Sequence, residues 1–169
     1  MIRAKAESDM VGMVRYPNRL TQMSEPPINL YRSLGNHPAL LRAWIDFAWT
    51  LREGITPRTL RELMILRGAQ LMNAEYEWHH HRRMATVAGV PAEKLEQLAN
   101  WRASDLFDER ERAALAYAEE INAGKVSDET AAALARYFAP AEMVELTLTA
   151  AFYAMVPRVL DALRVPVES

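Results

Sequence analysis

The residues most capable of chemistry lie in one short stretch, residues 74–81, which reads Ala-Glu-Tyr-Glu-Trp-His-His-His. It contains three of the four histidines of the chain. Glu77 and His81 are four residues apart, so on a helix their side chains lie on the same face. A carboxylate beside an imidazole is the smallest pair of groups that can transfer a proton near neutral pH. We therefore expect any catalysis to centre on this pair.

A further acidic residue, Glu62, interrupts an apolar stripe. Steps of three and four residues from it reach apolar side chains only, namely Ile65, Leu66, Ala69 and Met72. Burying a lone carboxylate is costly, so Glu62 must be paired, protonated or placed at the edge of a pocket. The alternative to a role in a site is a salt bridge to Arg61, to Arg67 or to an arginine of another helix.

Neighbouring residues could line a pocket around this pair. Successive residues on a helix point about 100° apart, so the three adjacent histidines cannot all face one site. His80 shares the face of Glu77, whereas His79 falls on the opposite, solvent-facing side. Tyr76 could wall the pocket and donate its hydroxyl, and Arg158 could hold an anionic substrate. The alternatives are that Arg158 is a solvated arginine on the last helix, and that His81 has only a structural role, hydrogen-bonded in the core.

A metal site is a second interpretation of the same residues. Glu77 and His80 have the Glu-x-x-His spacing of carboxylate-bridged di-iron bundles, but such sites need two of these motifs and the sequence has one. A mononuclear site from Glu62, Glu77 and His81 would supply two carboxylates and one imidazole. Because the spacing alone is a weak signal, we expect no metal and no other cofactor.

The composition limits the possible functions. With 169 residues, half of them apolar, the chain can form one domain or a small domain with an arm. The net charge of -2 and the pI near 6.1 give no electrostatic reason to bind nucleic acid. No signal peptide and no apolar stretch long enough to span a bilayer is visible, so we expect a cytoplasmic protein without a membrane partner. The absence of cysteine excludes disulfides, thiol nucleophiles and thiolate metal sites.

The pattern along the chain is typical of an all-α protein, because no segment alternates apolar and polar residues as a strand does. Three prolines before residue 28 indicate an extended arm over residues 1–27. Thr56, Asp108 and Ser127 have the residue types of helix N-caps, and Gly89 and Gly124 those of helix ends. We expect helices at 30–34, from 38 onward, and at 57–72, 75–88, 91–100, 108–122, 127–138 and from 140 onward, with a bend at Pro157.

Several of these segments together resemble a known family. Residues 61–67 (Arg-Glu-Leu-x-Ile-Leu-Arg), 75–81 (Glu-Tyr-Glu-Trp-x-x-His) and 89–91 (Gly-Val-Pro) are similar to the carboxymuconolactone decarboxylase family, which is related to the AhpD-like alkylhydroperoxidases. The resemblance extends over most of the chain. It implies an AhpD-like helical domain over residues 28–169, assembled as a homo-oligomer (dimer, trimer or hexamer) with sites near subunit interfaces.

The redox branch of this superfamily carries a Glu, eleven residues, Cys-x-x-Cys, three residues and a His. Counted from Glu62, the cysteine positions fall on Ala74 and Glu77, and the histidine falls on His81. The spacing is kept, but both thiols are missing. Thiol peroxidase or disulfide reductase activity is therefore excluded, because disulfide exchange needs a thiolate.

The decarboxylase branch implies a different chemistry, carried out without a cofactor on lactone acids from aromatic catabolism. On this resemblance we expect a lyase or isomerase whose substrate is a small anionic lactone or ring-derived acid. His81 would be the main acid–base group, poised by Glu77, and Glu62 would orient His81 or exchange a proton with the substrate. Tyr76, His80 and Arg158 would bind the substrate. There are two alternatives. One is a metal-dependent enzyme that uses Glu62, Glu77 and His81 as ligands, and the other is a non-catalytic helical assembly protein.

Overall fold

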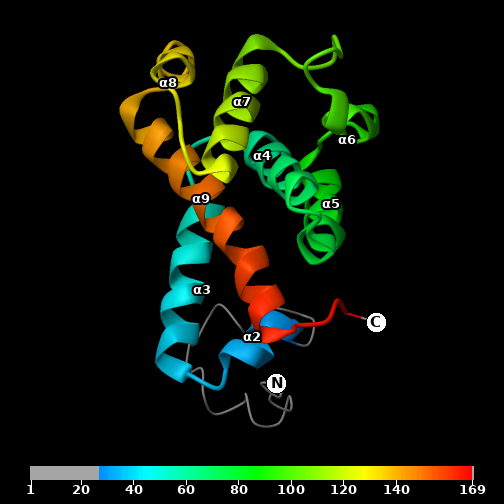
Figure 1. The fold of residues 1–169 in the computed structure, drawn as a ribbon, viewed down its shortest axis with the longest axis vertical. Helices are drawn as coiled ribbons and strands as arrows, with labels where there is room; N and C mark the ends of the chain where they lie inside the picture. Colours follow the sequence, from blue (N-terminus) through cyan, green and yellow to red (C-terminus); the bar gives the residue numbers. More distant parts are fainter. Residues whose placement is uncertain (1–26, 169) are drawn as a thin grey trace. The chain divides into compact units, whose positions relative to one another are not determined.

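The computed structural model describes residues 27–168, and within this range the secondary structure is helical, with no strand. The all-α prediction is confirmed. The predicted arm over residues 1–27 lies outside the described residues, apart from its last position. The helices are α2 (Asn29–Leu34), α3 (Pro38–Arg52), α4 (Arg58–Leu71), α5 (Glu75–Ala88), α6 (Ala92–Gln97), the 3-10 turn η1 (Leu98–Asn100), α7 (Glu109–Ala123), α8 (Asp128–Ala135) and α9 (Pro140–Leu163) (Figure 1).

The described residues fall into two compact units. The terminal unit comprises 27–50 and 158–168, and the central unit is Leu51–Pro157. In the terminal unit, Leu41 and Ile45 of α3 are buried in a small apolar cluster. The backbone N–H of Asn29 donates to a carboxylate oxygen of Glu168 at 2.6 Å, which ties the start of α2 to the C-terminal tail.

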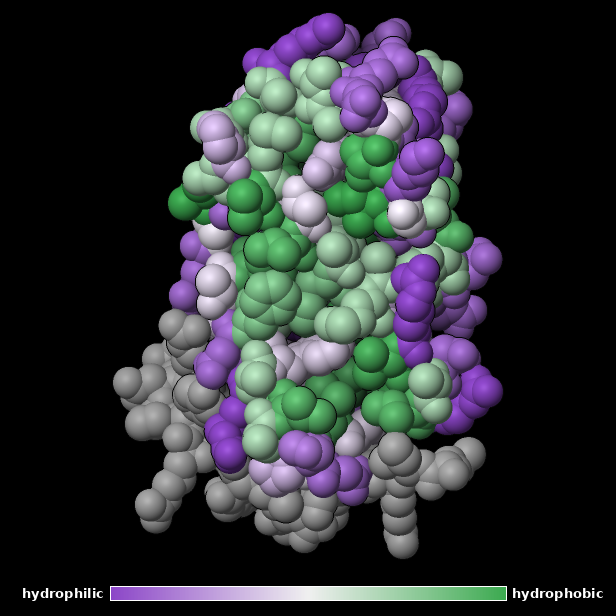
Figure 2. All heavy atoms as spheres, turned by 60° about the vertical axis from the view of Figure 1, so that its left-hand side comes forward, coloured by the Kyte–Doolittle hydropathy of each residue, from purple (hydrophilic) through white to green (hydrophobic). Residues whose placement is uncertain are grey.

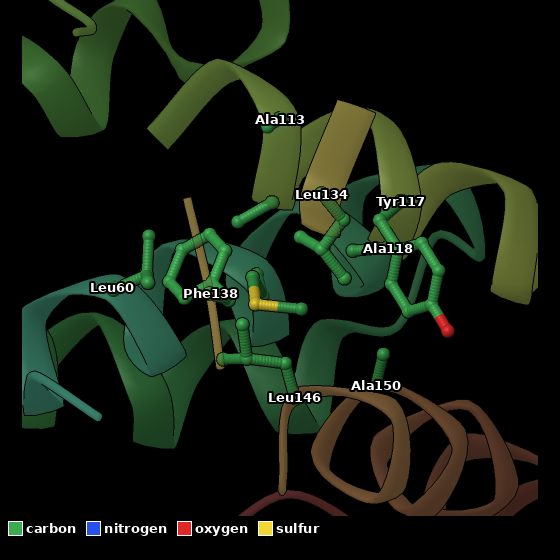
Figure 3. Packing of buried hydrophobic residues seen from close by; sticks show 10 residues of the cluster. Leu60, Ala113, Tyr117, Ala118, Leu134, Phe138, Leu146 and Ala150 are labelled. Carbon is green, nitrogen blue, oxygen red and sulfur yellow. The ribbon is translucent and has the colours of Figure 1, made fainter. Parts of the chain in front are cut away.

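In the central unit α4 is the helix around which the others pack. It contacts both α5 and α7. Leu60 and Met64 on one side of α4 join a cluster with residues of α7, α8 and α9 (Figure 3). Leu63 and Leu66 on another side join a second cluster with residues of α5, α6 and α7. A helix that is covered on several sides is a core helix, and this is why a polar residue on α4 is enclosed by protein.

The helix ends follow the expected residue types in most places. Asp108 forms a capping box at the start of α7, and the Ser127 hydroxyl accepts from a backbone N–H at the start of α8. Gly89 and Gly124 end α5 and α7 with φ of 95° and 86°, the left-handed region that favours glycine. The predicted N-cap role of Thr56 is wrong: its hydroxyl donates to a carboxylate on α9, and α4 begins without a side-chain cap.

α9 corrects one expectation from the sequence. This helix of 24 residues contains an 18-residue window with a mean hydropathy of 1.3, so it is long and apolar enough to cross a membrane by length and composition alone. One such helix is weak evidence, because the core helix of a soluble protein passes the same test. Leu146 and Ala150 of α9 are buried in the cluster of Figure 3, so packing explains part of the apolar composition.

α9 also carries apolar side chains on its exposed side. Val144, Leu148 and Met155 are exposed, and their spacing of four and seven residues places them on one face of the helix. Figure 2 shows apolar side chains gathered over part of one face of the molecule. Such areas are common at interfaces between proteins. The expected homo-oligomer stays a prediction.

Candidate active site

The structure brings Glu62 of α4 and His81 of α5 into direct contact. Nδ1 of His81 lies 2.8 Å from Oε2 of Glu62. Glu62 has no exposed surface and His81 is 6% exposed. The His81 ring packs edge-on against the ring of Tyr153 from α9, with the ring centres 4.7 Å apart. Three helices of the central unit therefore enclose this imidazole–carboxylate pair.

The second carboxylate oxygen of Glu62 accepts hydrogen bonds from an arginine. Nε of Arg58 donates to Oε1 of Glu62 at 2.6 Å, and a second guanidinium nitrogen of Arg58 also reaches this oxygen. Arg58 lies four residues before Glu62, one turn away on α4. The expected partners Arg61 and Arg67 are wrong, because they pair with carboxylates of α9 and α7 instead. Glu62 thus joins a cation on one oxygen to an imidazole on the other.

These contacts set the charges of the pair. Burial by itself raises the pKa of Glu62, but the hydrogen bond to His81 and the charge of Arg58 outweigh it and hold that pKa below its ordinary value. Burial lowers the pKa of His81, and the charges of Arg52 and Arg58 lower it further, although the bond to Glu62 opposes them. At neutral pH Glu62 is an anionic acceptor, so Nδ1–H of a neutral His81 donates to it and Nε2 keeps its lone pair.

Glu77 does not form the contact with His81 that the sequence suggested. Its side chain is 3% exposed and neither carboxyl oxygen has a hydrogen-bond partner. The expectation that Glu77 poises His81 is wrong in its geometry, since the carboxylate bonded to His81 is Glu62. Burial raises the pKa of Glu77 to about 7, opposed by the backbone N–H of the same residue. A good share of the Glu77 side chains therefore carries a proton at neutral pH and can donate it.

The predicted substrate-binding residues are only partly near this pair. Tyr76 is buried, and its ring lies 4.6 Å from the ring of His80, tilted by 43°. His79 is exposed, as expected. Arg158 is exposed and belongs to the terminal unit.

A pocket adjoins the pair through Arg58 and Tyr153, which both contact the pair and line the pocket. Its empty space is about 210 Å³, part of which is open to solvent. The space that a water-sized sphere can occupy corresponds to about one water molecule. The lining residues come from the end of α3 and from α4 and α9: Leu51, Arg52, Arg58, Arg61, Ile65, Thr149 and Tyr153.

Sequence reasoning missed four polar residues of this site: Arg52, Arg58, Thr149 and Tyr153. Arg58 could have been found, because an arginine one turn before an acidic residue on an apolar stripe is its natural partner. Arg52, Thr149 and Tyr153 give no such local signal, since they reach the site only through the packing of α4 against other helices.

The metal alternative lacks a ligand set in the described part of the chain. No three side chains of His, Cys, Asp or Glu gather there in a way that could hold an ion. Glu62 and His81 are bonded to each other, and the Glu77 oxygens have no polar partner. The three proposed ligands therefore do not form one site.

Comparison with known proteins agrees with this fold. Residues 38–120 match the model of the carboxymuconolactone decarboxylase family. No curated protein matches the chain. A Cys-to-Ala variant of the debrominase Bmp8 in complex with 2,3,4-tribromopyrrole is 21% identical with a TM-score of 0.86, and the alignment covers 100% of this chain and 92% of that one.

Two further structures are peroxidase-related proteins. The one from Ralstonia eutropha, described as an alkylhydroperoxidase AhpD core, is 16% identical with a TM-score of 0.76, over 98% of this chain and 87% of that one. The one from Silicibacter sp. is 18% identical with a TM-score of 0.75, and the alignment covers 88% of this chain and 80% of that one. At these identities the likeness shows the fold alone. The family match places residues 38–120, a segment without the Cys-x-x-Cys pair, in the carboxymuconolactone decarboxylase family.

Proposed function

We propose that this protein is a cofactor-independent lyase (decarboxylase) or isomerase that acts on a small anionic lactone or ring-derived acid. Membership in the family supports the coarser statement, an enzyme that processes a small molecule. The observation that carries the finer proposal is the buried hydrogen bond of 2.8 Å between His81 and Glu62, with Arg58 on the other carboxylate oxygen.

In this proposal His81 is the base. The carboxylate of Glu62 accepts the Nδ1 proton, which fixes the tautomer and the orientation of the ring. The pKa of His81 is lowered by burial, so the imidazole is neutral at pH 7 and its Nε2 can take a proton. Arg58 keeps Glu62 ionised and in place. Glu62 is thus a positioning residue and His81 the group that moves the proton.

Glu77 is the acid in this proposal. Burial raises its pKa to about 7, while the pKa of Glu62 is lowered by its partners. Two carboxyl groups with pKa values pushed apart by their surroundings are suited to different roles, one protonated and one ionised. Glu77 lies one helical turn before His81 on α5, and the proposal requires the substrate to reach both of these buried side chains.

Isomerisation uses both His81 and Glu77, whereas decarboxylation uses Glu77 as the proton donor. In decarboxylation the bond between the ring and the carboxylate breaks, carbon dioxide leaves and the electron pair stays on the ring as an enolate. Glu77 then gives a proton to carbon. In isomerisation His81 takes a proton from one carbon and Glu77 returns one to another, so the double bond moves. Neither route requires an external oxidant or reductant.

The test is turnover of the full chain on a panel of carboxylated lactones, followed by carbon dioxide release and by proton NMR of the products. His81→Gln should lower kcat for isomerisation by about a hundredfold to ten-thousandfold, because His81 takes the first proton in that reaction. His79→Gln is the matched control, because His79 is an exposed histidine on the same helix. Full turnover by His81→Gln, or an equal loss in both variants, would contradict the assignment. Thermal unfolding of both variants separates lost chemistry from lost folding.

A further inference from the structure

We infer that the pocket beside the His81–Glu62 pair is the subsite for one carboxylate group of the substrate, held by Arg52, Arg58 and the hydroxyl of Thr149. This inference rests on the proposed function, which it deepens by naming the group that the substrate must carry. Four observations lead to it: the charge of the lining, the convergence of two arginines, an unpartnered hydroxyl and the size of the space.

The lining of the pocket is positively charged. Three of its residues are arginines, and no acidic side chain is among the lining residues. Arg61 is almost fully buried and pairs with Glu145 at 3.0 Å, so it forms a fixed wall whose charge is already compensated. Guanidinium groups are the preferred protein partners of carboxylates, because their planar fork of donors matches two carboxylate oxygens.

The guanidinium groups of Arg52 and Arg58 both lie next to the side chain of Met84. Nη2 of Arg52 and Nη2 of Arg58 lie 3.4 and 3.6 Å from the sulfur of Met84. The two guanidinium groups therefore converge beside α5, the helix that carries His81. Both charges also lower the pKa of His81.

Thr149 supplies a hydroxyl without a partner. It is 1% exposed, it lines the pocket, and its Oγ1 makes no hydrogen bond. Thr147 on the same helix differs in this respect, because its hydroxyl bonds the backbone carbonyl of Met143 at 2.6 Å and the hydroxyl of Tyr117 at 2.9 Å. A buried hydroxyl without a partner costs free energy, so Thr149 is suited to donate to an acceptor that enters the pocket.

The size of the space selects a small group. Room for about one water molecule accommodates a carboxylate oxygen, but it excludes a ring. The ring of the substrate must then lie outside the pocket. Tyr153 lines the pocket and also packs against His81, so it adjoins both. A carboxylate seated in the pocket would hold the ring beside the base.

The experiment measures binding without turnover. The full chain is labelled with ¹³C at the threonine methyl groups and titrated with sodium formate at constant ionic strength. Formamide is the neutral probe of the same size, and chloride is the probe for a free ion. We expect formate to shift the Thr149 methyl signal to saturation, formamide to shift it far less, and chloride to bind more weakly than formate.

The variants separate the subsite from general effects. Thr149→Val and Arg52→Gln should each weaken formate binding about tenfold, because each removes a donor to a charged group. Thr149→Ser should keep binding, since it keeps the hydroxyl. Thr147→Val should also keep it, because the Thr147 hydroxyl is bonded within the protein.

Three results would overturn the inference: formate and formamide acting alike, equal losses in Thr149→Val and Thr147→Val, or chloride binding as tightly as formate. Because the titration needs no reaction, it can fail while His81→Gln still abolishes turnover. Equally, formate can bind as expected in a protein whose turnover does not depend on His81. The two proposals therefore fail independently.

Discussion

The imidazole of His81 and the carboxylate of Glu62 form a hydrogen bond of 2.8 Å that joins α5 to the buried α4. Glu62 has no exposed surface, so the bond is made away from water. A charge in such a place must be compensated, and Arg58 compensates it. The bond therefore serves both the stability of two packed helices and the protonation state of the imidazole, and variants can separate the two roles.

Replacing Glu62 by Gln should change the titration of His81. The bond to Glu62 and its negative charge both raise the pKa of His81, so their loss should lower that pKa further and free the ring to adopt either tautomer. Nitrogen-15 NMR of the histidine ring reports both quantities. Glu119→Gln is the control, because Glu119 is also paired with arginines but lies on α7. An unchanged His81 titration in Glu62→Gln would show that the bond is absent in solution.

Removing the charge of Arg52 should act in the opposite direction. Arg52 lowers the pKa of His81 through its charge, so Arg52→Gln should raise that pKa. The same NMR titration measures it, with the exposed Arg82→Gln on α5 as the control. A pKa that stays the same or falls would place the Arg52 charge away from the pair.

Much of the fold was predictable, because local residue types decide it. Two helices begin with a side-chain cap, from Asp108 and Ser127, and two end at a glycine with positive φ, Gly89 and Gly124. Each of these residues acts within one turn of a helix end. Thr56 was misassigned because a carboxylate of α9, far along the chain, binds its hydroxyl. A local pattern cannot reveal such a competitor.

The sequence identified residues of the site, but it did not identify which carboxylate bonds His81. Glu62 was found because it interrupts an apolar stripe, and His81 because of its spacing from a carboxylate. Their contact depends on how α4 packs against α5, which the sequence leaves open between Glu62 and Glu77. The spacing of Glu77 and His81 permits a contact without requiring it, whereas the expectation that Glu62 orients His81 agrees with the observed bond.

Gly54 should not tolerate a side chain. A Cβ at this position would meet the carboxylate of Glu145, which accepts hydrogen bonds from the backbone of Ile55 and Thr56 and pairs with Arg61. Moving Glu145 would disturb all of these contacts, so Gly54→Ala should destabilise the protein by about 1–3 kcal/mol. Urea unfolding measures this. Gly124→Ala is an instructive comparison, since nothing lies near its Cβ and its cost should come from the backbone alone. An unchanged midpoint in Gly54→Ala would show that Glu145 is not held there.

Glu77 should make the protein less stable as pH rises. Burial raises its pKa in the folded state from 4.5 to about 7, so between these values the folded protein holds a proton that the unfolded chain releases. The free energy of unfolding then falls by up to about 1.4 kcal/mol per pH unit across this window, about 3 kcal/mol in total, and the effect is complete above pH 7. His81 has the opposite sign, because its lowered pKa costs stability as pH falls below its ordinary value.

The difference between Glu77→Gln and the unaltered protein isolates the contribution of Glu77. Glutamine resembles the protonated carboxyl group, so the variant should match the unaltered protein near pH 4.5 and be more stable above pH 7. Urea unfolding at a series of pH values measures the difference, and Glu75→Gln, an exposed glutamate on the same helix, should show none of it. Parallel curves for Glu77→Gln and the unaltered protein would mean that Glu77 is ionised at neutral pH and cannot be the proton donor of the proposed reaction.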